Sequence, residues 1–415
     1  MTGHAASGTL SGMKSVRFFY DIACPYAYIA STQIEAICAA ANASLEWCPI
    51  LLGGLYRSVG GTDHPAASWP ASKIQHNERD MTRQAECFGV PLQRPDCYPQ
   101  RTVATQRLLL AASPEIRPAL THRLFRAYWV EGLPVGSRAV LGHIAEEFDL
   151  DLGCLDDPAA KKALFDATQE AQDLGMFGVP SFQVDDTFYW GADRLHFVAR
   201  DLGLERLPPE DAPVQDTQPT IEFFHDFASP FSYLGATQIE RVAKAQGAKL
   251  IYRPILLGAL FKDIGTPLIP IFEMSVPRQN YMQRDLREWA KWWNVPFTFA
   301  EVFPMRTVTP LRVALQQPQT TALIYDAAWG RGINVGDPEN LRALLDGAGF
   351  DGQALIKGTQ NPEIKAQLFE NTQRAIDHGV CGAPSFRVNE TTLFWGQDRL
   401  GMVEAACSGW VPRNG

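Results

Sequence analysis

The sequence predicts an α/β protein built from two tandem copies of one domain, and three observations lead to this prediction. The chain has 415 residues, of which 46% are apolar and 20% charged, a balance that suits packed domains rather than disorder. A set of short motifs occurs twice along the chain. In each copy, short apolar runs typical of β-strands stand at both ends of a long, largely helical middle section.

The repeat is clearest at the two ends of each copy. The pattern F-F-x-D-x-A-x-P begins at Phe18 and again at Phe223, 205 residues later. The pattern P-S-F-x-V begins at Pro180 and again at Pro384, 204 residues later. Solenoid repeats have units of about 20–50 residues, so a spacing this long indicates a duplicated whole domain.

The domain limits follow from this repeat and from composition. We expect a tail over residues 1–13, a first domain over 14–203, a linker over 204–218 and a second domain over 219–411. The linker is rich in proline and acidic residues and has few apolar anchors, as is typical of a segment between domains.

Each copy is expected to open with a strand, a helix and a second strand that pairs in parallel with the first. The first strands are Ser15–Tyr20 and Thr220–His225, and the second strands lie at 45–48 and 249–253. The helical middle includes 119–130 and 340–348, and each copy closes with two strands, ending at Trp190 or Trp395, and a helix. Strands at both ends and helices between them make a thioredoxin-like sheet with a helical insertion.

Composition and spacing exclude several classes of function. With 37 Lys and Arg against 46 Asp and Glu, the net charge of −9 argues against a nucleic-acid partner. No apolar run is long enough for a signal peptide or a membrane span, so we expect no membrane partner and a cytoplasmic location. The eight cysteines show no C-x-x-C spacing and the histidines no metal-binding spacing, so we expect no metal site.

The turn from the first strand into the first helix carries the strongest chemical signal. It places Cys24 in copy one and Ser229 in copy two at a helix N-terminus, followed in each case by a proline that suits the first helical turn. Free N–H groups there stabilise a negative charge, so we predict a depressed pKa and a nucleophilic sulfur for Cys24. Ser229 could donate a hydrogen bond to the thiolate of another molecule. The alternatives are an ordinary helix cap for Ser229 and a buried small hydrophobe for Cys24.

Two further motifs recur near the end of each copy. Val179-Pro180 and Ala383-Pro384 stand between a glycine turn and a strand, where a cis bond would present backbone groups to a peptide-like ligand. Gly-x-Asp-Arg follows at Asp193-Arg194 and Asp398-Arg399. These aspartates could cap the last helix, or could bind the ammonium and carboxylate groups of an amino-acid-like ligand.

Together and in this order, the motifs resemble the family of 2-hydroxychromene-2-carboxylate isomerases and kappa-class glutathione transferases, within the DsbA-like thioredoxin fold. The resemblance covers nearly all of each copy. It rests on Y-D-x-x-C-P-Y from Tyr20, H-D-x-x-S-P-F-S-Y from His225, G-V-P-S-F from Gly178 and F-W-G-Q-D-R-L from Phe394.

The resemblance implies a glutathione site at the junction of the thioredoxin and helical parts. The serine that holds the glutathione thiolate corresponds to Ser229, and in copy one to Cys24. The residue whose backbone pairs with glutathione, together with its proline, corresponds to Ala383-Pro384 or Val179-Pro180. The residues that bind the γ-glutamyl end of glutathione correspond to Gln397-Asp398-Arg399, or in copy one to Ala192 with Asp193 and Arg194. An asparagine of the family is replaced by Gly61 and Thr266, and a lysine by a residue near Gln279, with Lys73 its nearest equivalent in copy one.

The preferred hypothesis is a glutathione-dependent isomerase or transferase acting on an electrophilic, unsaturated aromatic acid. Candidates for binding the substrate carboxylate are Arg306 and Arg312 in copy two and Arg101 and Arg107 in copy one. One alternative is thiol–disulfide exchange by Cys24 as a single thiol, since Ala27 stands where a resolving thiol would be. Another is a tandem domain that binds thiols or peptides without catalysis. Analogy with the family also suggests a pseudo-dimer within one chain.

Overall fold

The computed structural model describes residues 13–62, 65–205 and 218–413. The expected tail (1–13) and linker (204–218) therefore lie almost wholly outside the described residues. The chain forms two compact units. Among the described residues, the first unit contains 13–62 and 88–205, and the second contains 65–87 and 218–413.

The first unit has a four-stranded sheet in the order β2-β1-β3-β4, with β1 and β2 parallel and the other neighbours antiparallel. Its strands are β1 (Ser15–Tyr20), β2 (Ser44–Pro49), β3 (Ser181–Val184) and β4 (Thr187–Trp190). Helix α1 (Pro25–Ala40) joins β1 to β2. The remaining helices are α2 (Leu52–Ser58), α4 (Val103–Ala111), α5 (Arg117–Trp129), α6 (Arg138–Glu146), α7 (Pro158–Asp173) and α8 (Leu195–Asp201), with short 3-10 turns at Leu152–Leu155 and Ala192–Arg194.

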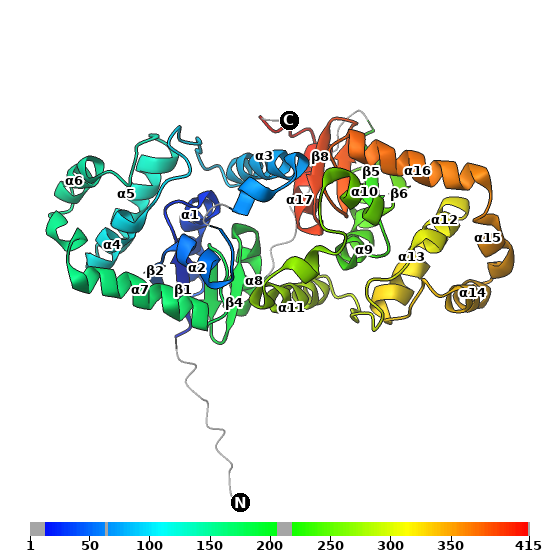
Figure 1. Cartoon of the computed structure of the whole chain (residues 1–415), viewed down its shortest axis with the longest axis horizontal. Helices are drawn as coiled ribbons and strands as arrows, with labels where there is room; N and C mark the ends of the chain where they lie inside the picture. The colour runs from blue at the N-terminus through cyan, green and yellow to red at the C-terminus, as the bar shows by residue number, and fades with distance from the viewer. Residues whose placement is uncertain (1–12, 63–64, 206–217, 414–415) are drawn as a thin grey trace, which may run out of the picture. The chain divides into compact units, whose positions relative to one another are not determined.

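The second unit repeats this plan with the strand order β6-β5-β7-β8 (Figure 1). Its strands are β5 (Thr220–His225), β6 (Lys249–Pro254), β7 (Ser385–Val388) and β8 (Thr392–Trp395). Its helices are α9 (Pro230–Ala245), α10 (Leu257–Ile264), α11 (Val276–Trp292), α12 (Val308–Gln316), α13 (Thr320–Tyr325), α14 (Pro338–Gly347), α15 (Gly352–Gly358), α16 (Pro362–Asp377) and α17 (Leu400–Cys407). A π-helical turn at Asp326–Gly330 and 3-10 turns at Pro270–Glu273 and Gln397–Arg399 complete it.

The predicted fold class is confirmed: each copy is an α/β domain with a mixed sheet and a helical insertion. Both first strands have the predicted limits, and Pro25 and Pro230 begin their helices. Within the described residues, no helix is long and apolar enough to cross a membrane. Each of the eight cysteines is a free thiol. In the same part of the chain, no three His, Cys, Asp or Glu side chains gather as metal ligands would.

Helix α3 (Ala71–Cys87), with the 3-10 turn Pro65–Ser68, comes from the first copy in sequence but packs in the second unit. It lies beside β8 and α17 (Figure 1). The Arg83 guanidinium donates a 2.6 Å hydrogen bond to the Leu393 carbonyl and lies 4.8 Å from the centre of the Phe394 ring. The His76 ring contacts Trp395 edge to face at 5.4 Å. The second unit is thus completed by residues that precede it by more than a hundred positions.

The sheet of the second unit has a packed core on each face. Because side chains alternate along a strand, Phe223 and Phe224 point to opposite faces. Phe223 packs with α9 and α17, whereas Phe224 packs with α10 and α16. Phe223 also stacks on Phe386 at 5.2 Å, as Phe18 stacks on Phe182 at 5.1 Å in the first unit. The two cores fix the sheet against its helices, and with it the turn that leads into α9.

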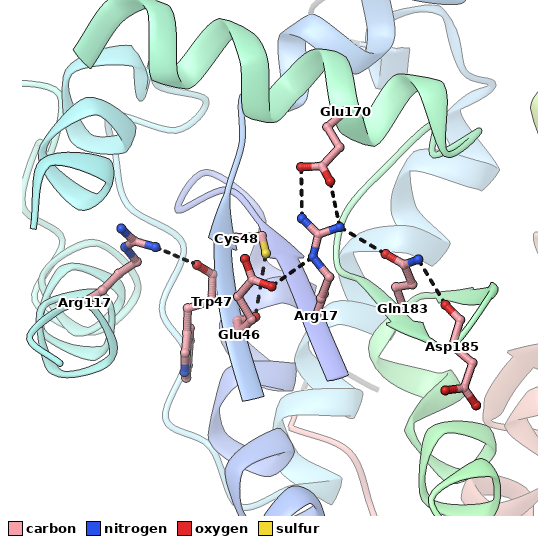
Figure 2. A network of polar contacts seen from close by, with 8 residues as sticks. All are labelled: Arg17, Glu46, Trp47, Cys48, Arg117, Glu170, Gln183 and Asp185. Carbon is pink, nitrogen blue, oxygen red and sulfur yellow. Dashed lines mark hydrogen bonds and ion pairs between the residues drawn. The ribbon is translucent and has the colours of Figure 1, made fainter. Parts of the chain in front are cut away.

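One ion pair has opposite charges in the two copies. In the first unit, Arg17 on β1 donates to both carboxylate oxygens of Glu170 on α7, at 2.8 and 2.9 Å, and also contacts Glu46 (Figure 2). In the second unit, Glu222 has the place of Arg17, and Arg374 on α16 has the place of Glu170. Glu222 accepts from Arg374 at 2.9 and 3.1 Å and also from Arg253 and Arg387. Both partners have changed sign, so each sheet is matched to the helix of its own copy.

Candidate active site

Ser229 lies where β5 turns into α9 and occupies the N-cap position of that helix. Its Oγ accepts a hydrogen bond from the Ser232 N–H at 3.1 Å and donates one to the Ala383 carbonyl at 2.8 Å. The serine is only 5% exposed. The hydroxyl therefore contacts both the free N–H groups at the N-terminus of α9 and the loop that contains Ala383. The alternative interpretation of Ser229, a helix cap, is thus observed, and the same atom also contacts Ala383, a second candidate residue.

The loop containing Ala383 has the backbone that the sequence suggested. The Ala383-Pro384 bond is cis, as is Val179-Pro180 in the first unit. Gly382 is required here, because a Cβ at this position would lie 2.6 Å from the indole nitrogen of Trp395. The Gly396 N–H donates to the Pro384 carbonyl at 3.0 Å, which ties the following turn to this loop. The loop at Ala383-Pro384 and the turn at Gly396 are thus adjacent, and we call the surface formed by residues 383–399 the wall.

The 3-10 turn Gln397–Arg399 continues that wall. Gln397 is buried, and the Arg399 guanidinium contacts Asp398 at 3.2 Å. Arg399 also binds Asp80 on helix α3, with Nε–Oδ1 and Nη2–Oδ2 distances of 2.5 and 2.9 Å. Neither aspartate of the Gly-x-Asp-Arg motif caps the last helix, because Arg399 and Arg194 occupy the N-cap positions of α17 and α8. Asp80 is a residue that sequence reasoning missed, since nothing local shows which unit α3 joins.

Lys73 lies on the same helix, near its start. Its ammonium group is 4.3 Å from the centre of the Trp69 ring. Burial and, to a lesser degree, Arg278 lower the pKa of Lys73, and the Cys381 thiol partly offsets this. Helix α3 thus brings a cation, as well as the Asp80 carboxylate, into the second unit. Gln279, which stands near the family's lysine position, donates to the Met274 carbonyl at 2.8 Å.

A buried carboxylate holds the turn before Ser229 in place. Asp226 Oδ1 accepts from the Ala228 N–H at 2.9 Å and from the Thr307 hydroxyl at 2.6 Å, and Oδ2 accepts from the Leu257 N–H at 2.9 Å. Burial raises the pKa of Asp226, while these hydrogen bonds lower it. Asp226 joins three segments that are remote in sequence. Asp226 could have been recognised from the sequence, because it is part of the repeated F-F-x-D motif, but the sequence analysis assigned it no role.

The first unit has the same geometry around Cys24 but different chemistry. The Cys24 thiol points to the Val179 carbonyl at 3.2 Å, and Cys24 is 6% exposed. Burial raises the pKa of Cys24 to about 12, and the N–H groups of Ala27 and Tyr26 only partly oppose this. The predicted depressed pKa is therefore wrong: removal from water outweighs the helix N-terminus. Asp193 and Arg194 pair at 3.1 Å beside the loop at Pro180, because the Gly191 N–H donates to the Pro180 carbonyl.

The four candidate arginines fall into two groups. Arg306 and Arg101 are exposed, and each directly precedes a threonine (Thr307 or Thr102) that donates to the buried aspartate of its copy. Arg312 and Arg107 lie further along the following helices and reach into the helical insertion. Arg312 donates to the Thr359 carbonyl at 3.5 Å, and Arg107 donates to the Leu155 carbonyl at 3.0 Å.

Aromatic side chains gather next to the turn before Ser229. The Trp329 indole donates to the Phe227 carbonyl at 2.8 Å. The Trp329 ring contacts Phe299 at 5.6 Å and Phe303 at 6.3 Å, and Phe303 in turn contacts the half-exposed Phe272. At the equivalent place in the first unit, Arg94 lies over Tyr98 instead. The side chains beside the turn of the second copy are therefore aromatic, whereas those beside the turn of the first copy include a cation.

A mixed four-stranded sheet, an interrupting helical segment and a helix N-terminus facing a cis-proline loop define a thioredoxin-type protein. The chain belongs to the family of DSBA-like thioredoxin domains, which matches residues 15–203 and again residues 220–408. The two copies of the predicted family are thereby confirmed.

The chain is homologous to the two groups of enzymes that its motifs resemble. It is 33% identical over 190 residues to a 2-hydroxychromene-2-carboxylate isomerase of Sphingobium xenophagum, covering 45% of this chain and 96% of that protein. It is 26% identical over 206 residues to human glutathione S-transferase kappa 1, covering 44% of this chain and 88% of that protein. Among solved structures, a 2-hydroxychromene-2-carboxylate isomerase aligns with 46% of this chain and 94% of its own, with a TM-score of 0.41 and 21% identity.

Proposed function

We propose that the second copy is a glutathione-dependent isomerase or transferase in which the Ser229 hydroxyl holds the thiolate of glutathione. The observation that carries this proposal is the position of Ser229 Oγ, between the Ser232 N–H and the carbonyl of Ala383. A thiolate arriving at this place would accept the hydroxyl proton that Ala383 accepts in the structure. Homology to glutathione transferases and to an isomerase supports the same chemistry.

The energy needed is modest. Lowering a thiol pKa from about 9 to about 7 takes roughly 2.7 kcal/mol, because each unit is worth about 1.4 kcal/mol. A hydrogen bond to a charged group contributes about 1.5–3 kcal/mol, and a helix N-terminus about 0.3–1 kcal/mol. The hydroxyl of Ser229 and the N-terminus of α9 supply these two contributions at one point.

The remainder of glutathione would bind along the wall that runs from position 383 to position 399. The backbone of Ala383, followed by Pro384, would pair with the cysteinyl part of glutathione. Gln397, Asp398 and Arg399 would bind the γ-glutamyl end, where a carboxylate and a guanidinium suit an ammonium and a carboxylate. Asp80 acts through Arg399 and is a positioning residue: its carboxylate fixes the plane of that guanidinium.

The substrate would be an aromatic or unsaturated acid. The aromatic side chains of Phe299 and Phe303, which are partly exposed and pack on the buried Trp329, suit a planar apolar body. Arg306 is exposed and adjacent to the site, and we assign it the substrate carboxylate. The glutathione sulfur adds to an activated carbon and displaces an electron pair onto the conjugated system. Rotation or ring opening follows, and the return of that pair expels the thiolate, so isomerisation consumes no glutathione.

The first copy is proposed to be non-catalytic. Cys24 is buried, and its raised pKa leaves almost no thiolate at neutral pH, which disfavours thiol–disulfide exchange. Its sulfur points to the Val179 carbonyl with the geometry that Ser229 has in the second copy. Binding of a thiol or peptide without reaction remains compatible with that arrangement.

The test compares the two equivalent positions in the full chain. Ser229→Ala should lower turnover of a hydroxychromene-type acid with glutathione by about 100-fold, and Cys24→Ala should change it less than twofold. An undiminished rate in Ser229→Ala, or a large loss in Cys24→Ala, would refute the assignment. A fragment beginning at 219 is unsuitable, because it lacks helix α3.

Asp80→Asn tests the positioning role. We expect the KM for glutathione to rise about threefold to tenfold with little change in kcat, because the thiolate donor Ser229 is untouched. An equal fall in kcat and kcat/KM would show that Asp80 acts in another way. Glu86, which lies on the same helix and contacts Arg413 near the chain end, provides the control variant Glu86→Gln.

A further inference from the structure

A groove in the first unit lies outside the site just described. It has a volume of about 290 Å³, is open to solvent and is lined by residues of α2, α4 and α7 and by Leu51. Cys24, Val179 and Pro180 do not line it. Ligand sites usually measure about 300–1,000 Å³, so this groove lies at the lower limit and suits a ligand of only a few heavy atoms.

All the charged residues that line the groove are cations. Each of the three helices contributes one cation: Arg57 from α2, Arg107 from α4 and Lys161 from α7. No acidic side chain is among the lining residues. Three cations around one groove contrast with the net charge of −9 of the whole chain. Such a groove attracts an anion.

Arg107 has hydrogen-bonding capacity left over. Its Nη1 donates to the Leu155 carbonyl, but its Nε is buried and has no hydrogen-bond partner in the structure. A buried donor without a partner costs free energy, so this guanidinium is held with part of its hydrogen-bonding capacity unused. Lys161 is exposed at the rim, while its neighbour Lys162 is paired with Asp166.

The rest of the lining is apolar. Leu51, Val103 and Leu164 contribute aliphatic surface, and Phe165 stands at the edge with 67% of its surface exposed. Large hydrophobic side chains this exposed are few among the described residues, and the equivalent residue of the second copy, Phe369, is another, at 69%. Arg312 and Lys365 also repeat the cations at 107 and 161. The combination of cations and an aromatic edge recurs although the residue at the helix N-terminus has changed.

We propose that this groove binds a small organic carboxylate with an apolar body, held by Arg107 and Lys161 and covered by Phe165. The carboxylate would accept from the Arg107 guanidinium and from the Lys161 ammonium. The apolar body would lie against Leu164 and Phe165. This is a binding site separate from that of glutathione, and it does not depend on the function proposed for Ser229.

The test measures binding to the full chain by calorimetry, with Lys365→Ala and Phe369→Ala present throughout so that any equivalent site of the second copy is weakened about 25-fold. The probes are benzoate, its neutral analogue benzamide, and inorganic phosphate, which has charge without an apolar body. We expect benzoate to bind at least tenfold more tightly than either of the others, and more weakly as salt is added.

Two exposed substitutions locate the site without disturbing the fold. Lys161→Ala and Phe165→Ala should each weaken benzoate binding about fivefold, as expected for the loss of one surface contact of about 1 kcal/mol. Lys162→Ala removes the same charge one residue away and should have no effect. Equal effects of Lys161→Ala and Lys162→Ala, or binding of benzamide or phosphate as tight as that of benzoate, would overturn the proposal.

Discussion

Replacing Glu222 by glutamine is expected to destabilise the second unit strongly. The Glu222 side chain is only 2% exposed and is surrounded by Arg253, Arg374 and Arg387, each with an N–O distance of 2.9 or 3.0 Å. Glutamine keeps the shape but removes the charge, so three guanidinium groups are left facing one another. Removing one partner of a buried ion pair costs about 3–5 kcal/mol.

The matched control is Glu170→Gln in the first unit. Glu170 faces Arg17 with equally short distances, but its side chain is 51% exposed. Water can replace the lost contact there, so the cost should stay below about 1 kcal/mol. Urea unfolding of the full chain, followed by tryptophan fluorescence, gives the free energy of unfolding for each variant.

The pH dependence provides an independent measurement. Burial alone would raise the pKa of Glu222, but the hydrogen bonds from Arg374, Arg387 and Arg253 outweigh it, and the pKa falls below its ordinary value of 4.5. The carboxylate therefore stabilises the folded state above about pH 4.5, and this contribution is lost as the pH falls through the lowered pKa. Glu222→Gln should remove that part of the acid-induced loss. A cost no larger than that of Glu170→Gln would refute the reasoning.

Two further predictions concern buried groups. Because burial raises the pKa of Cys24 to about 12, its alkylation by iodoacetamide at pH 8.5 should be at least about 100-fold slower than that of free glutathione. Mass spectrometry of the modified peptide would measure this, and half-maximal reactivity near pH 8.5 would contradict it. Burial lowers the pKa of His225 from 6.5 to about 3, so the unfolded chain takes up a proton first as the pH falls. Between pH 7 and pH 5 the free energy of unfolding of the second unit should fall by about 2 kcal/mol through this group. His225→Gln should abolish that fall. The same difference in free energy between the two pH values in the variant would disprove the role of His225.

Much of the fold could be predicted because local sequence determines it. The apolar runs at 15–20 and 220–225 are bounded by turn residues, and the strands have those limits. The repeat then gave the number of copies without any knowledge of long-range contacts. The cis bonds at Pro180 and Pro384 were anticipated from their recurrence, whereas those at Pro99 and Pro304 were not.

The parts that could not be predicted depend on contacts between remote segments. The residues of α3 predict a helix, but its partner is chosen by Arg83 and Asp80, which meet Leu393 and Arg399 more than three hundred residues later. The prediction of a depressed pKa for Cys24 was wrong for a related reason. A helix N-terminus can be read from the sequence, but the degree of burial that opposes it depends on the whole fold.

Helix α3 also has a consequence for the edge of a sheet. In the order β6-β5-β7-β8, strand β8 is an outer strand, and outer strands present unpaired carbonyls that can pair with another chain and promote aggregation. Arg83 donates a hydrogen bond to the Leu393 carbonyl, and its guanidinium covers the Phe394 ring. Separating the halves of this protein at residues 206–217 would leave that edge uncovered. The duplicated domains are therefore not interchangeable modules, because residues 65–87 of the first copy pack in the second unit.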